Sequence, residues 1–500
     1  MASSLRIGGL ASGMDIDSMV KELMKAERMR LDSLTRKRQI LQWQREDYRT
    51  INNILRSFRD TVFNMKLQGT FLTRRADSNN ESVVKVTAGG SAVDGIYEVK
   101  VTQMARGAYL TGGQIGSEEN PIDPTRSIAS QLELSGEKKL VISGPDGTKK
   151  TFTINTDTAS INDLVNRINT GLDDNGKTWG VRASYDAVNR RFFLMTKDTG
   201  VNQTIEIEDG ELAEALKLTG DGVVYSPGQD AKYKLNGVDL TAPSNKVLIN
   251  GLTLELKGES DIPITVTVSR DTDSIFNVIK GFVEKYNETI DAINKEYYEE
   301  RYKDYQPLTD AMREELSDKQ EEQWEEKARS GMLRFDSMLG STLNKFRNTM
   351  ISSIDGIIST EGYNNLSKIG INTASYQERG KLVIDETKLK EAIQKDPDGV
   401  MSFFTKSGDT YNEKGLAGRL YDDVTGAINS FITKAGSSDS LVDDSQVGKQ
   451  IRNIDKSIDT MNEHLQKMED RYWRQFTAME KAINQLNQQS AWLAMMFGGM

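Results

Sequence analysis

Side chains able to carry out acid-base, nucleophilic or metal chemistry are scarce in this chain. Its 500 residues include no cysteine and one histidine, His464. The lack of cysteine excludes thiol nucleophiles, disulfides and cysteine-based zinc sites, and one histidine leaves little scope for imidazole catalysis. His464 stands beside Met461 and Leu465 in a seven-residue repeat. This spacing favours a solvated position flanking a helix seam over a functional role.

Carboxylates are the remaining groups with catalytic potential. The chain has 74 aspartates and glutamates, and a glycosidase that cleaves cell-wall polymers would need two of them as a defined pair. In so large a set close pairs arise by chance, and none lies in a distinctive pocket-forming motif. We therefore expect a protein that is not an enzyme, with no catalytic, cofactor-binding or metal-binding residues and no cofactor.

Charge and hydropathy argue against two classes of partner. The formal net charge is -10, and basic residues are interspersed with acidic ones, so the chain lacks the basic surface that nucleic acids require. No run approaches the roughly 18 apolar residues that span a bilayer. The N-terminus also lacks the charged start and apolar core of a secretory signal. We expect no nucleic acid partner and no membrane insertion.

The elements that would position a functional surface are long helices near both ends of the chain. From Val447 onward, apolar residues recur every seventh position over six heptads, which is the pattern of a coiled-coil seam. A similar repeat runs between Val20 and Met65. Neither helix could bury such a stripe alone, so we expect the ends to pack on each other or on neighbouring chains. The C-terminal seam comprises Ile451, Ile458, Leu465, Tyr472, Met479, Leu486 and Leu493, and the N-terminal seam comprises Leu34, Leu41, Tyr48, Leu55 and Val62.

Two features of these helices have more than one interpretation. Basic residues such as Arg45 and Arg49 lie between the N-terminal seam positions, and a solvated helix face is favoured over a partner-facing stripe. The end of the last helix is more apolar than a seam requires. It is either a ligand for a groove on a partner or a patch that packs on the N-terminal helix. This apolar end comprises Trp492, Leu493, Met495, Met496 and Phe497.

Between the terminal helices the periodicity changes from helical to alternating. An alternating pattern from 78 to 272 predicts β structure, including a hairpin that turns at Pro145–Gly147 and a helix over Ile161–Leu172. Helical spacing then returns, interrupted by a strand at Leu382–Ile384 and by small polar residues at Gly436–Ser440 that predict a hinge. The predicted fold is α+β and multidomain, with terminal coiled-coil helices, a central helical bundle and inserted β-rich domains.

A glycine-rich opening segment carries a resemblance to a known family. Gly8, Gly9 and Gly13 precede a helix start at Asp15 in "IGGLASGMDIDSMVKELMKAE". This segment resembles the N-terminal signature of the bacterial flagellar filament cap family, the flagellar hook-associated protein 2 family. In that signature a Gly-Leu-Ala-Ser-Gly-Met/Leu-Asp run precedes a helix ending in a Leu-Met pair, here Leu23-Met24.

Further matches follow in the order of the family. The resemblance covers nearly the whole chain, although residues 106–225 are the least diagnostic and the charged segment 299–329 is longer than the minimal family pattern. The matching segments are "GIYEVKVTQMA", "DAKYKLNGVDL" with "SNKVLINGLTLELKG", "VIKGFVEKYNETIDAIN", "GMLRFDSMLGSTLNKFR", "SKIGI" with "GKLVIDETKLKEAIQKDPDGVMSFF", and "RQFTAMEKAINQLNQQSAWLAMMF".

The resemblance implies a function in filament growth and motility. Family members form a ring at the tip of the growing flagellum, where flagellin that is exported unfolded through the central channel folds and inserts. It implies a homo-oligomer of roughly four to six copies, with a pentamer as the default. Flagellin, the hook-filament junction protein and a flagellar export chaperone are the implied partners, with the chaperone contacting the apolar C-terminal end. The chain itself would leave by the flagellar type III export route without a cleaved signal peptide and reside outside the cell at the flagellum tip. Adhesion through the β-rich region is kept as an additional role, and a hook-filament junction protein and a surface adhesin are the alternatives.

The resemblance also gives the predicted parts their names. We expect the terminal helices to belong to a filament-core domain, the central bundle to form a leg domain, and the β-rich region to form head domains, with two modules. The division is 1–42 for the N-terminal flexible and helical core segment, 43–77 and 273–446 for the leg with its β-hairpin, 78–272 for the head, and 447–500 for the C-terminal coiled-coil helix.

Overall fold

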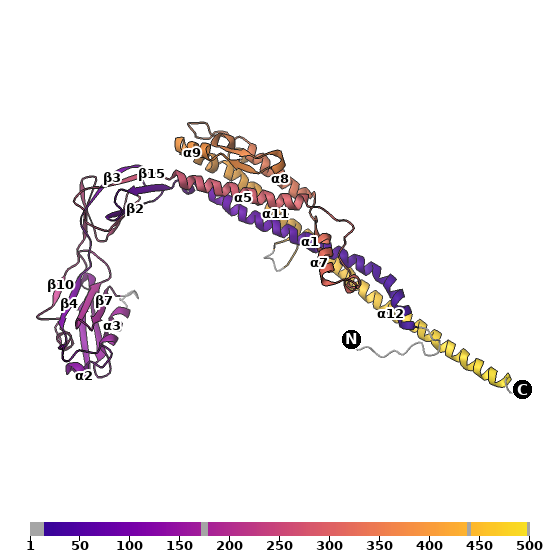
Figure 1. Cartoon of the computed structure of the whole chain (residues 1–500), viewed down its shortest axis with the longest axis horizontal. Helices are drawn as coiled ribbons and strands as arrows, with labels where there is room; N and C mark the ends of the chain where they lie inside the picture. The colour runs from indigo at the N-terminus through magenta and orange to yellow at the C-terminus, as the bar shows by residue number, and fades with distance from the viewer. Residues whose placement is uncertain (1–14, 172–178, 438–441, 498–500) are drawn as a thin grey trace. The chain divides into compact units, whose positions relative to one another are not determined.

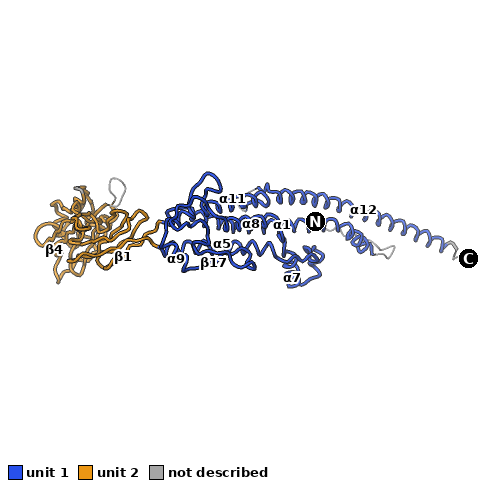
Figure 2. The backbone as a smooth tube through the Cα atoms, turned by 90° about the horizontal axis from the view of Figure 1, so that it is seen from above, with its two compact units in different colours: residues 1–71, 272–500 blue, residues 72–271 orange. Residues whose placement is uncertain are grey.

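The two ends of the chain combine into one compact unit, and the residues between them form another. The computed structural model describes residues 15–171, 179–437 and 442–497, apart from the side chains of Asp146, Met496 and Phe497. Residues up to 71 and from 272 onward make the first unit, which we call the helical unit (Figure 2). Residues 72–271 make the inserted unit. The α+β, multidomain fold class is confirmed.

Helix α1 (Ile16–Lys66) is the element on which the helical unit is assembled. The Asp15 side chain caps its first turn by accepting a hydrogen bond from the Ser18 amide at 3.0 Å. Its apolar side chains recur three and four residues apart, which places them on one face of the helix. Helices α5 (Thr272–Tyr298), α8 (Ser337–Ile351) and α11 (Leu416–Ala435) pack around this face (Figure 1).

Phe58 of α1 lies at the centre of this core. Its ring is fully buried and stands 6.0 to 6.3 Å from the rings of Phe282, Tyr286 and Phe346. These three aromatic residues come from α5 and α8, so one α1 side chain holds both helices in place. The other elements of the unit are α6 (Asp310–Glu314), α7 (Asp318–Arg329), α9 (Glu386–Lys395), α10 (Pro397–Thr405), α12 (Gln446–Phe497), β16 (Ile371–Thr373), β17 (Leu382–Ile384), η1 (Gln68–Thr70), η3 (Leu366–Ile369), η4 (Tyr376–Glu378) and η5 (Tyr411–Glu413).

The charged segment after α5 contains two short helices, α6 and α7, for which the sequence pattern alone assigns no element. Side-chain capping explains where each of the two helices begins. The Thr309 side chain accepts from the Met312 amide, and Ser317 forms a capping box with Gln320. Trp324 then fixes α7 by donating its indole N–H to the Gln306 carbonyl at 2.8 Å.

The inserted unit consists of antiparallel sheets around two hydrophobic cores. Its first and last strands, β1 (Arg74–Ser78) and β15 (Ile264–Arg270), pair with each other, so its two connections to the helical unit start from neighbouring strands. One core lies between the sheet β1-β15-β3-β11-β12 and the sheet β13-β14-β2. The other lies between the sheets β10-β4-β8-β7 and β6-β5-β9 and the helix α3.

The predicted local elements of the inserted unit are confirmed. β5 and β6 pair across a turn at Pro145–Gly147, and α3 (Ile161–Thr170) begins at a capping box formed by Ser160 and Asp163. The predicted end of that helix at Leu172 lies outside the described residues. The remaining elements are β2 (Val84–Ala88), β3 (Gly95–Gln103), β4 (Tyr109–Gln114), α2 (Ala129–Leu132), β5 (Glu137–Ser143), η2 (Pro145–Gly147), β6 (Lys149–Asn155), β7 (Val181–Asp186), β8 (Arg191–Thr196), β9 (Glu206–Ile207), α4 (Glu211–Ala215), β10 (Val224–Ser226), β11 (Ala231–Leu235), β12 (Val238–Ala242), β13 (Lys246–Ile249) and β14 (Leu252–Leu256).

The position of Phe58 generates a stability prediction. Phe58→Ala leaves a cavity between three helices, and we expect the free energy of unfolding of the helical unit to fall by about 3–5 kcal/mol. Phe63→Ala is the matched control, because Phe63 lies on the same helix but is 45% exposed. We expect the control to cost less than about 1 kcal/mol. Urea unfolding followed by circular dichroism at the helix band measures both; equal losses would contradict the central role of Phe58.

Candidate functional site

His464 is exposed on α12. No group of three or more histidine, cysteine, aspartate or glutamate side chains suited to a metal ion is present in the described ranges. Within the same ranges, no helix is both long and apolar enough to cross a membrane. The surfaces formed by the terminal helices are therefore the candidate sites.

The terminal helices contact each other along only part of their lengths. Ile16, Val20 and Met24 at the start of α1 are buried in a small cluster with Leu465 of α12, and Trp473 and Phe476 pack against it. Further along α1, residues of the predicted N-terminal seam enter the core shared with α5, α8 and α11. One continuous stripe on α1 thus serves two different partners.

The predicted seam residues fall into three groups by burial. Tyr48 and Leu55 are buried in the helical core, where the Tyr48 hydroxyl donates a hydrogen bond to the Asp336 carboxylate at 2.7 Å. Leu34, Leu41, Ile458 and Tyr472 are half-buried, and Ile451 and Leu465 are buried. Met479 and Leu486 are exposed, Leu486 by 62%. The apolar seam of α12 therefore continues well beyond the part of this helix that other described residues cover.

The apolar C-terminal end continues this uncovered surface. Trp492 and Leu493 are exposed, and Met495 is 79% exposed. The side chains of Met496 and Phe497 lie outside the described residues. Among the described residues none packs over Trp492 or Met495, so the interpretation as a patch on the N-terminal helix receives no support from these contacts.

The predicted hinge lies next to a charged cluster centred on Asp443. Residues 438–441 lie outside the described residues, but Gly436 has φ of +78° and an added Cβ would stand 2.6 Å from the Asp443 carboxylate. Arg49 and Arg45 of α1 reach the same carboxylate at 2.9 and 3.3 Å. These two arginines thus form internal ion pairs rather than only the solvated face that the sequence favours. They anchor the described ends of the hinge to α1.

The charge of Asp443 is stabilised by its surroundings. Burial by itself would raise the pKa of Asp443, but hydrogen bonds from Ser445 and the guanidinium groups of Arg49 and Arg45 outweigh burial and hold the pKa below its usual value. The ionised form therefore favours the folded state.

A second charged cluster lies where α5 approaches α1. Arg329 bridges the carboxylates of Glu46 and Asp47 at 3.1 and 3.4 Å. Burial raises the pKa of Glu296 to about 6, and the nearby charges of Asp47 and Glu299 add to the rise, whereas Lys295 and Arg329 oppose it. Sequence reasoning missed this cluster, because its members are far apart in the chain and match no motif. A raised pKa is typical of catalytic acids, but the same shift arises here from crowding at a helix junction.

The Asp443 cluster generates a pH-dependent prediction. We expect Asp443→Asn to lower the free energy of unfolding by about 2 kcal/mol near neutral pH, because charged hydrogen bonds are lost. The difference from the original protein should shrink as the pH falls through the lowered pKa, where the carboxylate protonates in both states. Urea unfolding at several pH values measures it. Asp444→Asn is the control, because Asp444 forms an exposed pair with Arg452, and an equal loss there would refute the proposed anchor.

The raised pKa of Glu296 predicts an effect on stability opposite in sign to that of Asp443. A folded-state pKa raised from 4.5 to about 6 means that the folded state binds the proton more tightly, so this group costs stability as the pH rises across that window. We expect Glu296→Gln to raise the melting temperature at neutral pH and to reduce its decline from about pH 4.5 to 6. Glu288→Gln, at an exposed position on the same helix, should leave the decline unchanged. An unaltered pH profile for Glu296→Gln would contradict the assignment.

Comparison with known proteins places this architecture in a family. Residues 12–108 match the flagellar hook-associated protein 2 N-terminus, and residues 228–488 match the flagellar hook-associated protein 2 C-terminus. The chain is 30% identical over 544 aligned positions to flagellar hook-associated protein 2 of Halalkalibacterium halodurans, covering 99% of this chain and 100% of that protein. The protein of the same name from Thermotoga maritima is 25% identical, with 99% and 96% covered.

A solved structure shares the fold. The crystal structure of the D1-D2-D3 domains of the flagellar cap protein FliD from Escherichia coli matches with a TM-score of 0.54 and 21% identity, covering 82% of this chain and 99% of that one. The resemblance seen in the sequence is confirmed by these matches, which extend across both units. The chain belongs to the flagellar hook-associated protein 2 family.

Proposed function

We propose that this chain caps the flagellar filament, forming an oligomeric ring at its tip beneath which exported flagellin folds and inserts. The observation that carries the proposal is the uncovered apolar row of α12 beyond Phe476, on a chain of this family. An exposed apolar row of this length is unfavourable in water and is typical of a surface that a partner covers. The family assignment does not favour the alternatives, a hook-filament junction protein or a surface adhesin.

The mechanism requires no bond to be made or broken. Helices α1 and α12 supply slender contacts to the filament core, and the β-rich inserted unit supplies lateral bulk. Movement of the ring as each flagellin subunit enters would follow from differences in contact energy between successive positions, which shift populations without catalysis. The relatives are named flagellar hook-associated protein 2, and we expect no enzymatic activity in this chain.

Partners and location follow from the same role. We propose a homo-oligomer with about five copies as the default and roughly four to six as the range. Flagellin, the hook-filament junction protein and a flagellar export chaperone are the proposed partners. The chain would leave the cell by the flagellar type III system without a cleaved signal peptide and reside at the flagellum tip. We retain the five-part division into core, leg and head segments as part of this proposal.

The C-terminal end provides the test. In a strain that lacks its own cap protein, the full chain should restore filaments, and Trp492→Ala with Leu493→Ala should reduce export or cap assembly by at least about tenfold, because two exposed hot-spot side chains are lost. Filament counts by electron microscopy and the amounts of this protein and of unassembled flagellin in the medium measure the effect.

A matched control variant distinguishes loss of a partner-binding surface from loss of exposed apolar side chains in general. Ile358→Ala removes an apolar side chain that is 83% exposed elsewhere in the helical unit, and filament number should stay normal. Normal filaments from the Trp492→Ala, Leu493→Ala variant would remove the partner role of this end. Absence of filaments with the unaltered full chain would contradict the proposed function itself.

A further inference from the structure

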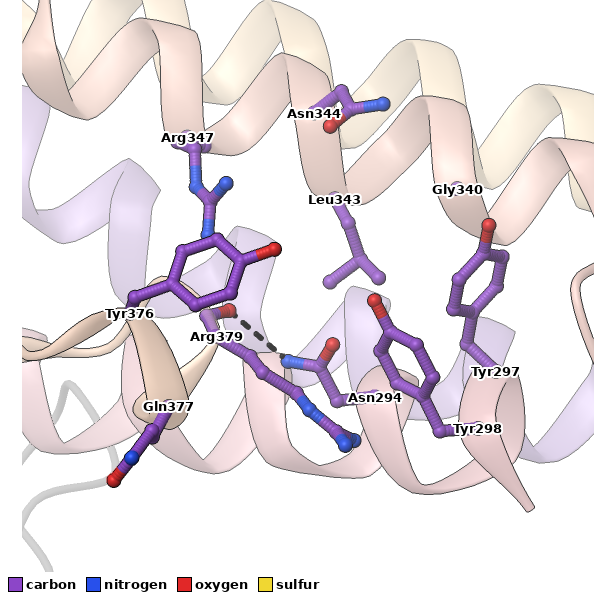
Figure 3. A pocket seen from close by; sticks show the side chains of 10 residues that line it. All are labelled: Asn294, Tyr297, Tyr298, Gly340, Leu343, Asn344, Arg347, Tyr376, Gln377 and Arg379. Carbon is purple, nitrogen blue, oxygen red and sulfur yellow. Dashed lines mark hydrogen bonds between the residues drawn. The ribbon is translucent and has the colours of Figure 1, made fainter. Parts of the chain in front are cut away.

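A polar cavity lies in the helical unit between the end of α5, helix α8 and η4. Its volume is about 460 Å³, and tyrosine, asparagine and arginine side chains face it (Figure 3). A second hollow of about 560 Å³ shares Tyr297, Gly340 and Asn344 with the first. Together they form one trough beside α8. No lining residue of either hollow is acidic, although acidic residues outnumber basic ones in the chain.

Three basic residues line the trough, Arg347, Arg379 and Lys345, and Lys345 is already paired with Asp423 at 3.1 Å. Arg379 has φ of +52°, its carbonyl accepts a hydrogen bond from the Asn294 amide at 3.2 Å, and its guanidinium lies 3.8 Å from the centre of the Tyr298 ring. Backbone conformation and ring stacking thus hold this guanidinium at the cavity. Arg347 reaches the same cavity from α8, close to Tyr376 in Figure 3.

Neither arginine has an ionic partner among the described residues. Of the acidic groups nearest in sequence, Asp291 pairs with Lys381 at 2.6 Å, and the exposed Glu378 forms no ion pair with either arginine in the described residues. Arginine binds carboxylates through paired N–H donors, and such pairs are stronger than neutral hydrogen bonds. The trough is therefore suited to a segment that presents carboxylates.

Helix α7 presents a segment of this kind on its outer face. Asp318, Glu322 and Glu326 are exposed and follow each other at intervals of four residues, which places them in one row. The inner acidic residues Glu321 and Glu325 pair with Arg313. The outer row has no ion pair in the described residues. Like charges at this spacing repel each other, so cationic groups on a partner would stabilise the row.

We propose that the trough beside α8 binds the acidic row of α7 from a second copy of this chain. Within one copy, the described residues show no ion pair between this row and the trough arginines, so the proposal assigns the contact to a second copy. A contact between two different surfaces repeats from copy to copy and closes into a ring when the rotation permits. This inference rests on the proposed ring and names one of its contacts.

Charge reversal tests the contact in the full-length protein. Arg347→Glu with Arg379→Glu, or Glu322→Arg with Glu326→Arg, should each weaken self-association at low salt by at least about tenfold, because like charges then meet. The fourfold variant restores complementarity and should associate within about threefold of the unaltered protein. Lys390→Glu with Lys395→Glu on α9 changes the net charge as much as the trough variant and should have no effect. Light scattering measures association, and circular dichroism confirms that each variant is folded.

Cysteine crosslinking gives a second measurement on assembled caps. Because the natural chain contains no cysteine, Gln323→Cys with Asn344→Cys should form disulfide-linked multimers on flagellated cells. Gln323→Cys with Gln394→Cys on α9 should not. Filaments that grow normally while the first pair fails to crosslink, or charge reversals that leave association unchanged, would overturn this contact and leave the cap proposal standing. Loss of filaments and of association in the unaltered chain would instead contradict the cap itself.

Discussion

The structure depends on the burial of one face of α1 by segments that come from the other end of the chain. Most of the stability of a helix in a protein comes from tertiary packing of its apolar face rather than from helix propensity. Helix α11 supplies Phe431 against Tyr48 with ring centres 5.8 Å apart, and α12 supplies Leu465 against Val20 and Met24. The helical unit therefore forms only when residues on both sides of the inserted unit have been made.

This dependence explains how a large β-rich unit is accommodated in the middle of the chain. The two connections start from β1 and β15, which pair from Arg74 with Arg270 to Ser78 with Val266. Because β1 and β15 are adjacent, the two connections to the helical unit start close together. The chain of the helical unit is therefore interrupted between two nearby points, whatever the size of the inserted unit. Insertions of this kind leave the helix packing undisturbed.

Charged residues in the helical unit divide into those with internal ionic partners and those without one in the described residues. Asp443 binds Arg45 and Arg49, and Arg329 binds Glu46 and Asp47, each across elements distant in sequence. Arg347 and Arg379 instead line the trough beside α8. The same division holds for apolar residues, since Leu465 is buried while Leu486 is 62% exposed on the same helix. The internally paired charges and the buried apolar residues stabilise the helical unit, and the proposed assembly contacts use the remaining exposed groups.

The sequence by itself determined the helical seams, the change to alternating strands, the hairpin at Pro145–Gly147 and the family, because periodicity and turn chemistry are local and survive without tertiary contacts. Only the tertiary structure decided which partner each part of a seam meets: Met24 contacts α12, whereas Leu55 enters the core with α5 and α11. It also decided that Arg45 is paired and that Asn294, Arg347 and Arg379 share one trough. The period of a sequence pattern indicates only that one face of a helix or strand is apolar or charged. The choice of what covers that face is made by packing between residues hundreds of positions apart, which no local pattern encodes.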